Sequence, residues 1–176
     1  MSTKVVIVGG VAGGATAAAR IRRLDEEAEI IVFERSGYVS YANCGLPYYI
    51  GDVITDQEEL TLATPESFFS RFRIDMKVNH EVTAINTERK TVSVKNLNTG
   101  EEFEESYDKL LLSPGAKPTQ PKLPGLGIDK LFTLRTVEDT LKIKEYINKH
   151  KPKSVVLAGG GFIGLELAEN LRDIGM

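Results

Sequence analysis

The alternation of hydrophobic and polar positions along the chain predicts buried strands separated by helices. Two apolar runs, 4–8 and 29–33, have the continuous hydrophobic character of parallel strands that are covered on both faces. Between them, residues 12–24 are rich in alanine and predict a helix. A strand, a glycine turn, a helix and a second strand make one repeating unit of a doubly wound, Rossmann-like α/β fold.

The middle of the chain predicts shorter elements. Residues 46–50 suggest a short helix, and Thr64 with Pro65 gives the cap and first-turn signal of a helix that runs to about Phe72. Residues 109–112 predict a buried parallel strand that returns to the first sheet. Before that strand, three short strand-like stretches predict a small antiparallel β-sheet insertion: 81–86, 91–95 and 102–105.

The proline- and glycine-rich stretch 114–127 predicts a connection between domains. After it, residues 136–150 suggest a helix, and the apolar run 154–158 predicts a strand that leads into a second glycine turn. This repeats the opening unit. Because the repeat reaches Met176 where another strand would be expected, we expect the sequence to be a fragment of a longer protein.

The first glycine turn follows a predicted strand and opens a predicted helix. Such a turn lets the backbone approach a pyrophosphate, whose charge is held by amide N–H groups at the positive end of the helix. The turn departs from the strict G-x-G-x-x-G pattern at its middle position, but Glu34 ends the second strand, where a carboxylate accepts hydrogen bonds from an adenosine ribose. A glycine-rich packing turn without a ligand is the alternative. The turn comprises Gly9, Gly10, Val11, Ala12, Gly13 and Gly14.

The second glycine turn fits the pattern fully. Two such units in one chain indicate two dinucleotides, a flavin and a nicotinamide, which is the pair needed to pass a hydride onward. We therefore expect FAD and either NADH or NADPH as cofactors, with residues 1–115 as the first segment of an FAD-binding domain. Residues 116–176 would hold a linker and the beginning of a truncated NAD(P)H-binding domain. A purely structural role is the alternative for this turn, which comprises Gly159, Gly160, Gly161, Phe162, Ile163 and Gly164.

The single cysteine, Cys44, cannot form an internal disulfide. If Asn43 caps the short helix that follows, Cys44 lies in its first turn, where the helix dipole favours the thiolate. Gly45 and Pro47 suit a core helix poorly, which favours a reactive thiol over an inert buried one. We predict that Cys44 is a redox nucleophile.

Composition and charge exclude other classes of function. The 22 basic and 25 acidic residues are well mixed, so the chain offers no basic face for nucleic acid and no polybasic membrane anchor. The first apolar run is too short for a signal segment or a membrane span, and we expect a cytoplasmic protein. His80 and His150 lack metal-ligand spacing, so both are expected to be structural or exposed, and no metal is expected.

These motifs resemble the single-cysteine branch of the pyridine nucleotide-disulfide oxidoreductases. That branch holds coenzyme A disulfide reductases, NADH oxidases, NADH peroxidases and rhodanese-fused persulfide reductases. Ordinary flavin disulfide reductases have a second cysteine where this chain has Tyr49, and Val11 with Ala42-Asn43-Cys44 resembles the coenzyme A disulfide reductases. The resemblance covers the whole chain and is most specific at 5–16, 38–48, 111–116 and 159–166.

The resemblance implies roles for individual residues. Flavin-holding positions beyond the first turn would be Glu34, Arg35, Asn43, Val82, Ser113, Pro114 and Gly115. Positions that line a coenzyme A channel would be Thr16, Arg20, Arg23, Ser40 and Asn43. Arg20 stands where a related reductase has an amide, and Phe72 replaces a lysine. As plain chemistry, charges such as Arg20 and Arg23 on an exposed helix face are usually just solvated.

The resemblance also implies an activity, in which NAD(P)H reduces the flavin and the flavin reduces a mixed disulfide between Cys44 and coenzyme A. The substrate would be a small-molecule thiol or disulfide: coenzyme A disulfide, coenzyme A persulfide or polysulfide. Alternatives are an NADH oxidase or peroxidase that cycles through a Cys44 sulfenate, and an electron-transfer flavoprotein without sulfur chemistry. The full-length protein would be a homodimer, and we expect the fragment alone to bind FAD weakly and to turn over no substrate.

Overall fold

The computed structural model describes residues 2–119 and 121–176, and the chain divides into two compact units. The first unit comprises Met1–Tyr41 and Thr61–Gly115, and the second comprises Ala42–Leu60 and Ala116–Met176. The expectation that residues 1–115 and 116–176 belong to an FAD-binding and an NAD(P)H-binding domain stays a prediction.

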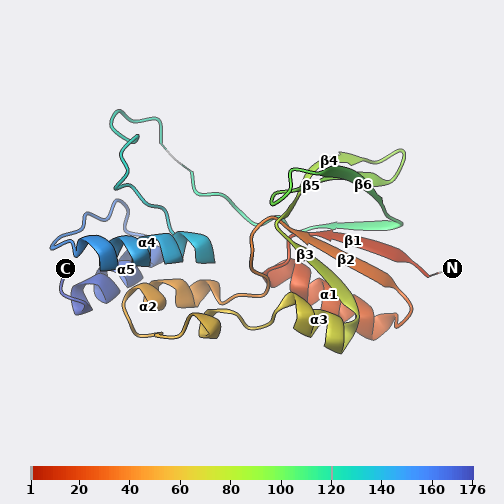
Figure 1. Ribbon diagram of the computed structural model, residues 1–176, viewed down its shortest axis with the longest axis horizontal. Helices are drawn as coiled ribbons and strands as arrows, with labels where there is room; N and C mark the ends of the chain where they lie inside the picture. Colours follow the sequence, from red (N-terminus) through yellow and green to blue (C-terminus); the bar gives the residue numbers. More distant parts are fainter. Residues whose placement is uncertain (1, 120) are drawn as a thin grey trace. The chain divides into compact units, whose positions relative to one another are not determined.

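A four-stranded parallel sheet forms the centre of the first unit (Figure 1). Its strand order is β3-β2-β1-β7. The central strands are built from β-branched and aromatic residues, which explains why they are buried on both faces. The strands are β1 (Lys4–Val8), β2 (Glu29–Glu34), β3 (Ile74–Val78) and β7 (Lys109–Leu112).

The two faces of this sheet are covered differently, as Figure 1 shows. Helices α1 (Ala12–Leu24) and α3 (Pro65–Phe72) pack on one face through a core that includes Ile7, Val32 and Phe68. The other face packs Phe33 and its neighbours against a small antiparallel sheet of order β4-β5-β6. Its strands are β4 (His80–Asn86), β5 (Thr91–Asn96) and β6 (Glu102–Ser106). The predicted doubly wound α/β fold with an antiparallel insertion is confirmed.

Two details of the first unit differ from the sequence prediction. Strand β3 was not predicted, although Ile74 and Met76 are buried and Asp75 between them is exposed, which is the alternation of a half-covered strand. Strand β7 was predicted to be buried, and this is wrong, since Leu112 is 56% exposed. Within the described chain β7 pairs only with β1, so its outer edge and part of its surface stay open.

The second unit is helical. Turn η1 (Asn43–Gly45) leads into α2 (Leu46–Ile50), and a further turn, η2, spans Gln57–Leu60. Helix α2 packs against both α4 (Val137–His150) and α5 (Phe162–Asp173). Across residues 2–119 and 121–176, no helix is both long and apolar enough to cross a membrane.

The predicted strand at 154–158 is wrong. These residues adopt no strand conformation, and Val156 is 92% exposed. A parallel strand exists only when a neighbouring strand pairs with its backbone, and no described segment pairs with 154–158. Its apolar sequence therefore predicts burial that this segment does not have here.

Candidate functional site

The first glycine turn joins β1 to α1, and its glycines lie close to neighbouring atoms. Gly9 has a φ of +97°, and a side chain there would collide with the carbonyl oxygen of Ser113. A side chain at Gly14 would collide with the carbonyl oxygen of Gly9. The backbone N–H of Ser113 donates to the Val8 carbonyl (2.7 Å), which fixes the chain after β7 against this turn. Both glycines are therefore required by the geometry of the turn.

The N-terminus of α1 has no side-chain cap, because its N-cap residue is Val11. Helices α3 and α4, by contrast, each begin with a capping box, formed by Thr64 with Ser67 and by Thr136 with Asp139. The first amide N–H groups of a helix lack intrahelical partners, and an uncapped end leaves them available to an anion. The predicted turn residues Gly10, Ala12 and Gly13 belong to this uncapped end.

Glu34 lies at the end of β2 with its carboxylate directed at the glycine turn. One oxygen accepts from the N–H of Gly10 (2.8 Å) and the other from the N–H of Ser36 (2.9 Å), and the residue is only 8% exposed. A carboxylate oxygen can accept more than one hydrogen bond, so both keep capacity for a ligand hydroxyl. Glu34 therefore both organises the turn and presents a buried acceptor beside it.

A cavity of about 220 Å³ opens beside this carboxylate in the first unit. It brings together five of the thirteen positions for which a flavin contact was predicted: Gly9, Glu34, Arg35, Val82 and Pro114. Ser113 contacts the glycine turn next to them, and Gly115 follows with a φ of +72°. His80 and Glu81 also line the cavity and were not predicted to do so. The ring of His80 packs against Phe33 and Phe103, and its Nδ1 lies 2.7 Å from the Val78 carbonyl, so it has a structural role.

A second cavity, of about 490 Å³, lies between α1 and α3, and we name it the α1–α3 groove. Its lining includes three of the residues predicted to contact coenzyme A, Thr16, Arg23 and Ser40. Arg20 is exposed and does not line it, whereas Phe72 does. The complete lining is Val11, Ala12, Ala15, Thr16, Ala19, Arg23, Ser40, Tyr41, Leu62, Phe68 and Phe72.

Arg22 holds the end of α3 to the end of α1 and was missed by the sequence prediction. This guanidinium is nearly fully buried and donates to the carbonyls of Phe72 (2.7 Å), Arg73 (3.0 Å) and Glu26 (2.6 Å). An arginine bonded to backbone carbonyls needs no acidic partner. Only the presence of an arginine in the last turn of a helix signalled this role.

Cys44 is exposed in turn η1 of the second unit. Asn43 does not cap the following helix, because the N-cap position of α2 is Gly45 and has no side-chain hydrogen bond. The Asn43 side-chain oxygen instead accepts from Nη1 of Arg135 (3.2 Å). Cys44 thus lies just before α2 and not in its first turn, so a helix-dipole argument for its reactivity loses its basis.

The second glycine turn precedes α5 and is open. Gly159 has a φ of +117°, but a side chain there, or at Gly160 or Gly161, would meet no other atom within 4 Å. Gly164 is the exception, since a side chain there would contact the Gly159 carbonyl. Helix α5 has no side-chain cap at its N-cap residue, Gly161.

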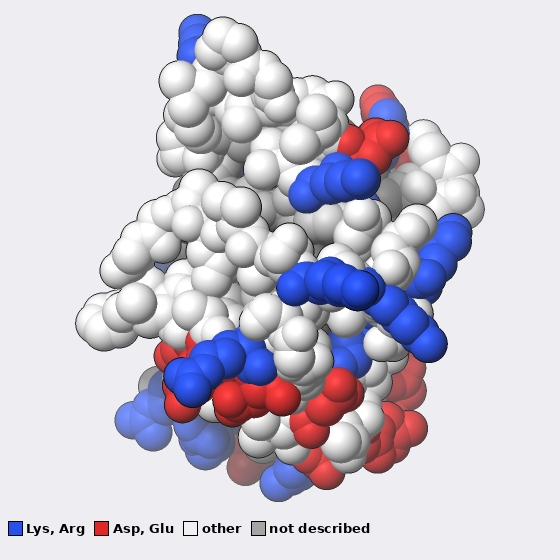
Figure 2. Space-filling view, turned by 90° about the vertical axis from the view of Figure 1, so that its left-hand side faces the viewer, with Lys and Arg blue, Asp and Glu red and all other residues white. Residues whose placement is uncertain are grey.

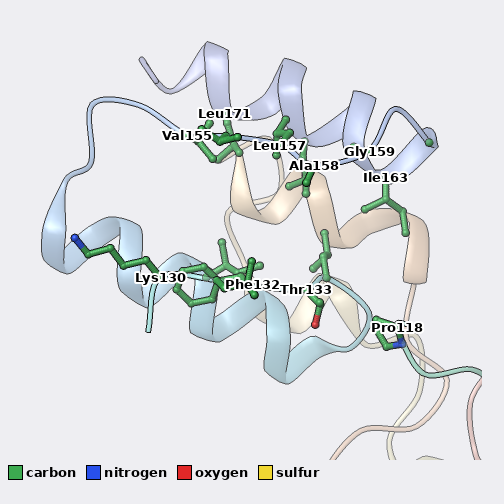
Figure 3. A pocket seen from close by; sticks show the side chains of 17 residues that line it. Pro118, Lys130, Phe132, Thr133, Val155, Leu157, Ala158, Gly159, Ile163 and Leu171 are labelled. Atoms are coloured by element: carbon green, nitrogen blue, oxygen red, sulfur yellow. The ribbon is translucent and has the colours of Figure 1, made fainter. Parts of the chain in front are cut away.

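An apolar cavity of about 450 Å³ lies beside the second turn. Gly159, Gly161, Ile163 and Gly164 line it, whereas Phe162 is 87% exposed and does not. Figure 3 shows the side chains from 155–158 near α5 and those from 130–133 on the facing segment. Large apolar side chains near this cavity are exposed, among them Val156, Phe162 and Leu165. Figure 2 shows a face of the molecule whose upper part carries little charge.

Over residues 2–119 and 121–176, no group of three or more histidine, cysteine, aspartate or glutamate side chains is placed to hold a metal ion. His150 is exposed on α4 with its ring beside Tyr146.

Comparison with known proteins adds relatives to this geometry. A family model described as pyridine nucleotide-disulphide oxidoreductase matches residues 3–176. Coenzyme A disulfide reductase of Staphylococcus aureus is 50% identical over 173 residues, which are 98% of this chain and 39% of that protein. The chain therefore spans about two fifths of the length of the curated relatives it matches.

Two solved structures share the arrangement. Reduced CoADR-RHD of Bacillus anthracis superposes with a TM-score of 0.98 at 55% identity and covers 100% of this chain and 32% of its own. The NAD-dependent persulfide reductase from A. fulgidus superposes with a TM-score of 0.92 at 37% identity and covers 98% of this chain and 32% of its own.

Proposed function

The chain belongs to the pyridine nucleotide-disulphide oxidoreductase family, and from this premise we propose that the whole protein is an FAD-dependent NAD(P)H:disulfide oxidoreductase. It would reduce coenzyme A disulfide, coenzyme A persulfide or polysulfide through Cys44. The observation that carries the proposal is an exposed, single thiol directly before α2, in a chain that also has two uncapped glycine turns. The relationship to a coenzyme A disulfide reductase supports the choice of substrate.

The first unit has the donors and acceptors that the adenosine diphosphate half of FAD requires. The uncapped N–H groups of α1 would hold the pyrophosphate, and Glu34 would accept hydrogen bonds from the ribose. Arg35, Val82 and Pro114 would border the ligand in the cavity beside that carboxylate. Asn43 remains a proposed contact, as do Ser113 and Gly115.

The second unit shares one feature of this kind that suits NAD(P)H, an uncapped helix start after a glycine turn. Helix α5 begins uncapped after Gly159–Gly161, so its first amides would hold a second pyrophosphate. Gly164 allows the helix to lie close to the turn, as Gly14 does in the first unit. Phe162 and Ile163 would complete this site.

Coenzyme A would enter the α1–α3 groove. Arg23 supplies a cation for its phosphates, and Thr16 and Ser40 supply hydroxyl groups, while the alanine face of α1 and Phe72 offer apolar contact. Arg20 does not line the groove, so Arg23 is the better candidate of the two for a substrate contact.

The sulfur chemistry needs only one thiol. The Cys44 thiolate attacks one sulfur of coenzyme A disulfide, the substrate S–S bond breaks, and one coenzyme A leaves as a thiolate that takes up a proton. The other remains joined to Cys44 as a mixed disulfide. Two electrons then break this bond and regenerate the Cys44 thiolate and the second coenzyme A. Bound FAD and NAD(P)H would supply these electrons.

The test replaces the sulfur in the full-length protein. Cys44→Ser is expected to lower the rate of coenzyme A disulfide reduction by about a thousandfold or more, because serine is a poor nucleophile here and cannot store the electrons. The FAD content and the NAD(P)H-dependent reduction of ferricyanide serve as controls and should stay at parental levels. A parental rate of coenzyme A release in Cys44→Ser would contradict the proposal, and consumption of oxygen or peroxide in place of disulfide would assign an oxidase or peroxidase.

A further inference from the structure

Arg135 is held in place by the N-terminal cap of α4. Its backbone N–H donates to the Asp139 carboxylate (2.9 Å), which also accepts from the N–H of Thr136 (3.1 Å) and completes the capping box. The backbone of Arg135 is therefore fixed to the first turn of a 14-residue helix. From this base its half-buried side chain reaches Asn43, with Nη1 3.2 Å from the amide oxygen.

The same helix also holds the far end of the segment that carries Cys44. Lys144 donates to the Ile50 carbonyl (2.8 Å) and pairs with the Asp52 carboxylate (2.6 Å), and its side chain is 12% exposed. Asn170 of α5 lies so close to Gly51 that a side chain at this glycine would collide with it. Turn η1 and α2 are thus anchored at both ends, by Arg135 in front of the thiol and by Lys144 behind it.

The chemistry of the pair fixes the orientation of the Asn43 amide. A guanidinium has N–H donors and no acceptor, so the amide must turn its oxygen toward Arg135. The other half of the amide is then an NH₂ group, which can only donate hydrogen bonds. The residue directly before Cys44 therefore offers donors, the polarity that suits a thiolate or an oxygen acceptor of a substrate.

We propose that Arg135 is a positioning residue for Cys44: it sets the orientation of the Asn43 amide and so fixes the turn that presents the thiol. The relevance of this inference to catalytic turnover rests on the proposed function. Arg135 itself acts through Asn43, so its effect is expected on the reactivity of the thiol and on KM, with kcat changed less.

The experiment compares two substitutions of Arg135 in the reduced, full-length holoenzyme. Arg135→Gln puts an amide opposite Asn43 that both donates and accepts, so the orientation of the Asn43 amide is no longer dictated. The rate of Cys44 alkylation by iodoacetamide at neutral pH is expected to fall about tenfold, as for the loss of one charge-assisted hydrogen bond. Arg135→Lys keeps a donor-only cation and should restore most of the rate.

Lys142→Gln is the matched control, because Lys142 is exposed on α4, the helix that Arg135 precedes, and the variant also loses one positive charge. It should alkylate at the parental rate. A parental alkylation rate and KM in Arg135→Gln would overturn the inference, and so would an equal loss in Arg135→Gln and Arg135→Lys. Alkylation requires no turnover, so it judges the positioning role even if Cys44→Ser shows that disulfide reduction does not depend on the thiol.

Discussion

The two glycine turns have nearly the same sequence pattern and very different surroundings. In the first, side chains added at Gly9 and Gly14 would collide with backbone, and Glu34 is hydrogen-bonded to the turn. In the second, Gly159 has open space around it, and the run before it forms no strand. The difference shows which parts of such a motif form locally and which depend on partners distant in the sequence.

The features of the motif that form between residues close in the sequence are the same in both turns. Each opens a helix without a side-chain cap, and in each the last glycine of the motif lies against the carbonyl of the first. The non-local part is present only in the first, where β7 brings Ser113 and β2 brings Glu34 to the turn. An uncapped helix end with its close glycine contact can therefore form without the strand pairing and the acidic acceptor that accompany the first turn.

The largest difference between the turns is expected for alanine at the first glycine of each. Gly9→Ala adds steric overlap with Ser113 to the cost of a positive φ, so the free energy of unfolding should fall by about 3 to 5 kcal/mol. Gly159→Ala has the strained φ alone and should lose only about 1 to 2 kcal/mol. Urea unfolding of both variants checks this, and equal losses would mean that the packing around the first turn contributes nothing.

A smaller effect is expected when the acceptor of the first turn is changed. Glu34→Gln replaces one carboxylate oxygen by an NH₂ group that must face a backbone N–H, so the free energy of unfolding should fall by about 1 to 3 kcal/mol. The affinity of the full-length protein for FAD should fall as well. Glu88→Gln, at an exposed glutamate, is the control for loss of charge. Unchanged stability and unchanged FAD titration would show that Glu34 does not organise the turn.

The smallest effect is expected at the position where the first turn departs from the pattern. Val11 has a negative φ of −97°, so the position is outside the left-handed region in which glycine is favoured. Val11→Gly should change the free energy of unfolding by about 1 kcal/mol or less, since it trades a half-buried side chain for backbone freedom. Calorimetric FAD titration should give a nearly parental affinity, and a tenfold increase would show that the missing glycine limits binding.

Elements whose signals are local could be predicted from the sequence. The strand 4–8 and the helices 12–24 and 46–50 have the bounds that their patterns indicated, and Thr64 with Pro65 does begin a helix. The errors in the sequence prediction concern strands, whose formation and burial depend on pairing with other strands. The run 154–158 is apolar enough for a strand but lacks a neighbour, and β7 was predicted to be buried without knowledge that it ends the described sheet.

The candidate site shows the same division. The glycines and Glu34 could be found because their spacing reports a known physical requirement, and the structure brings them to one turn. Arg22 and Arg135 could not be found, because in a sequence both resemble ordinary surface charges. Their roles arise from carbonyl and amide oxygens supplied by residues far along the chain.

The segment 42–60 leaves and rejoins the first unit at neighbouring points. Tyr41 and Thr61 form an antiparallel bridge, with the N–H of Leu62 donating to the Ser40 carbonyl and the N–H of Ala42 to the Leu60 carbonyl. The thiol therefore lies on an insert whose two ends are hydrogen-bonded to each other, as at the base of a hairpin. Because these ends are hydrogen-bonded to each other, the path of the chain at Tyr41 and Thr61 does not depend on the length of the insert between them.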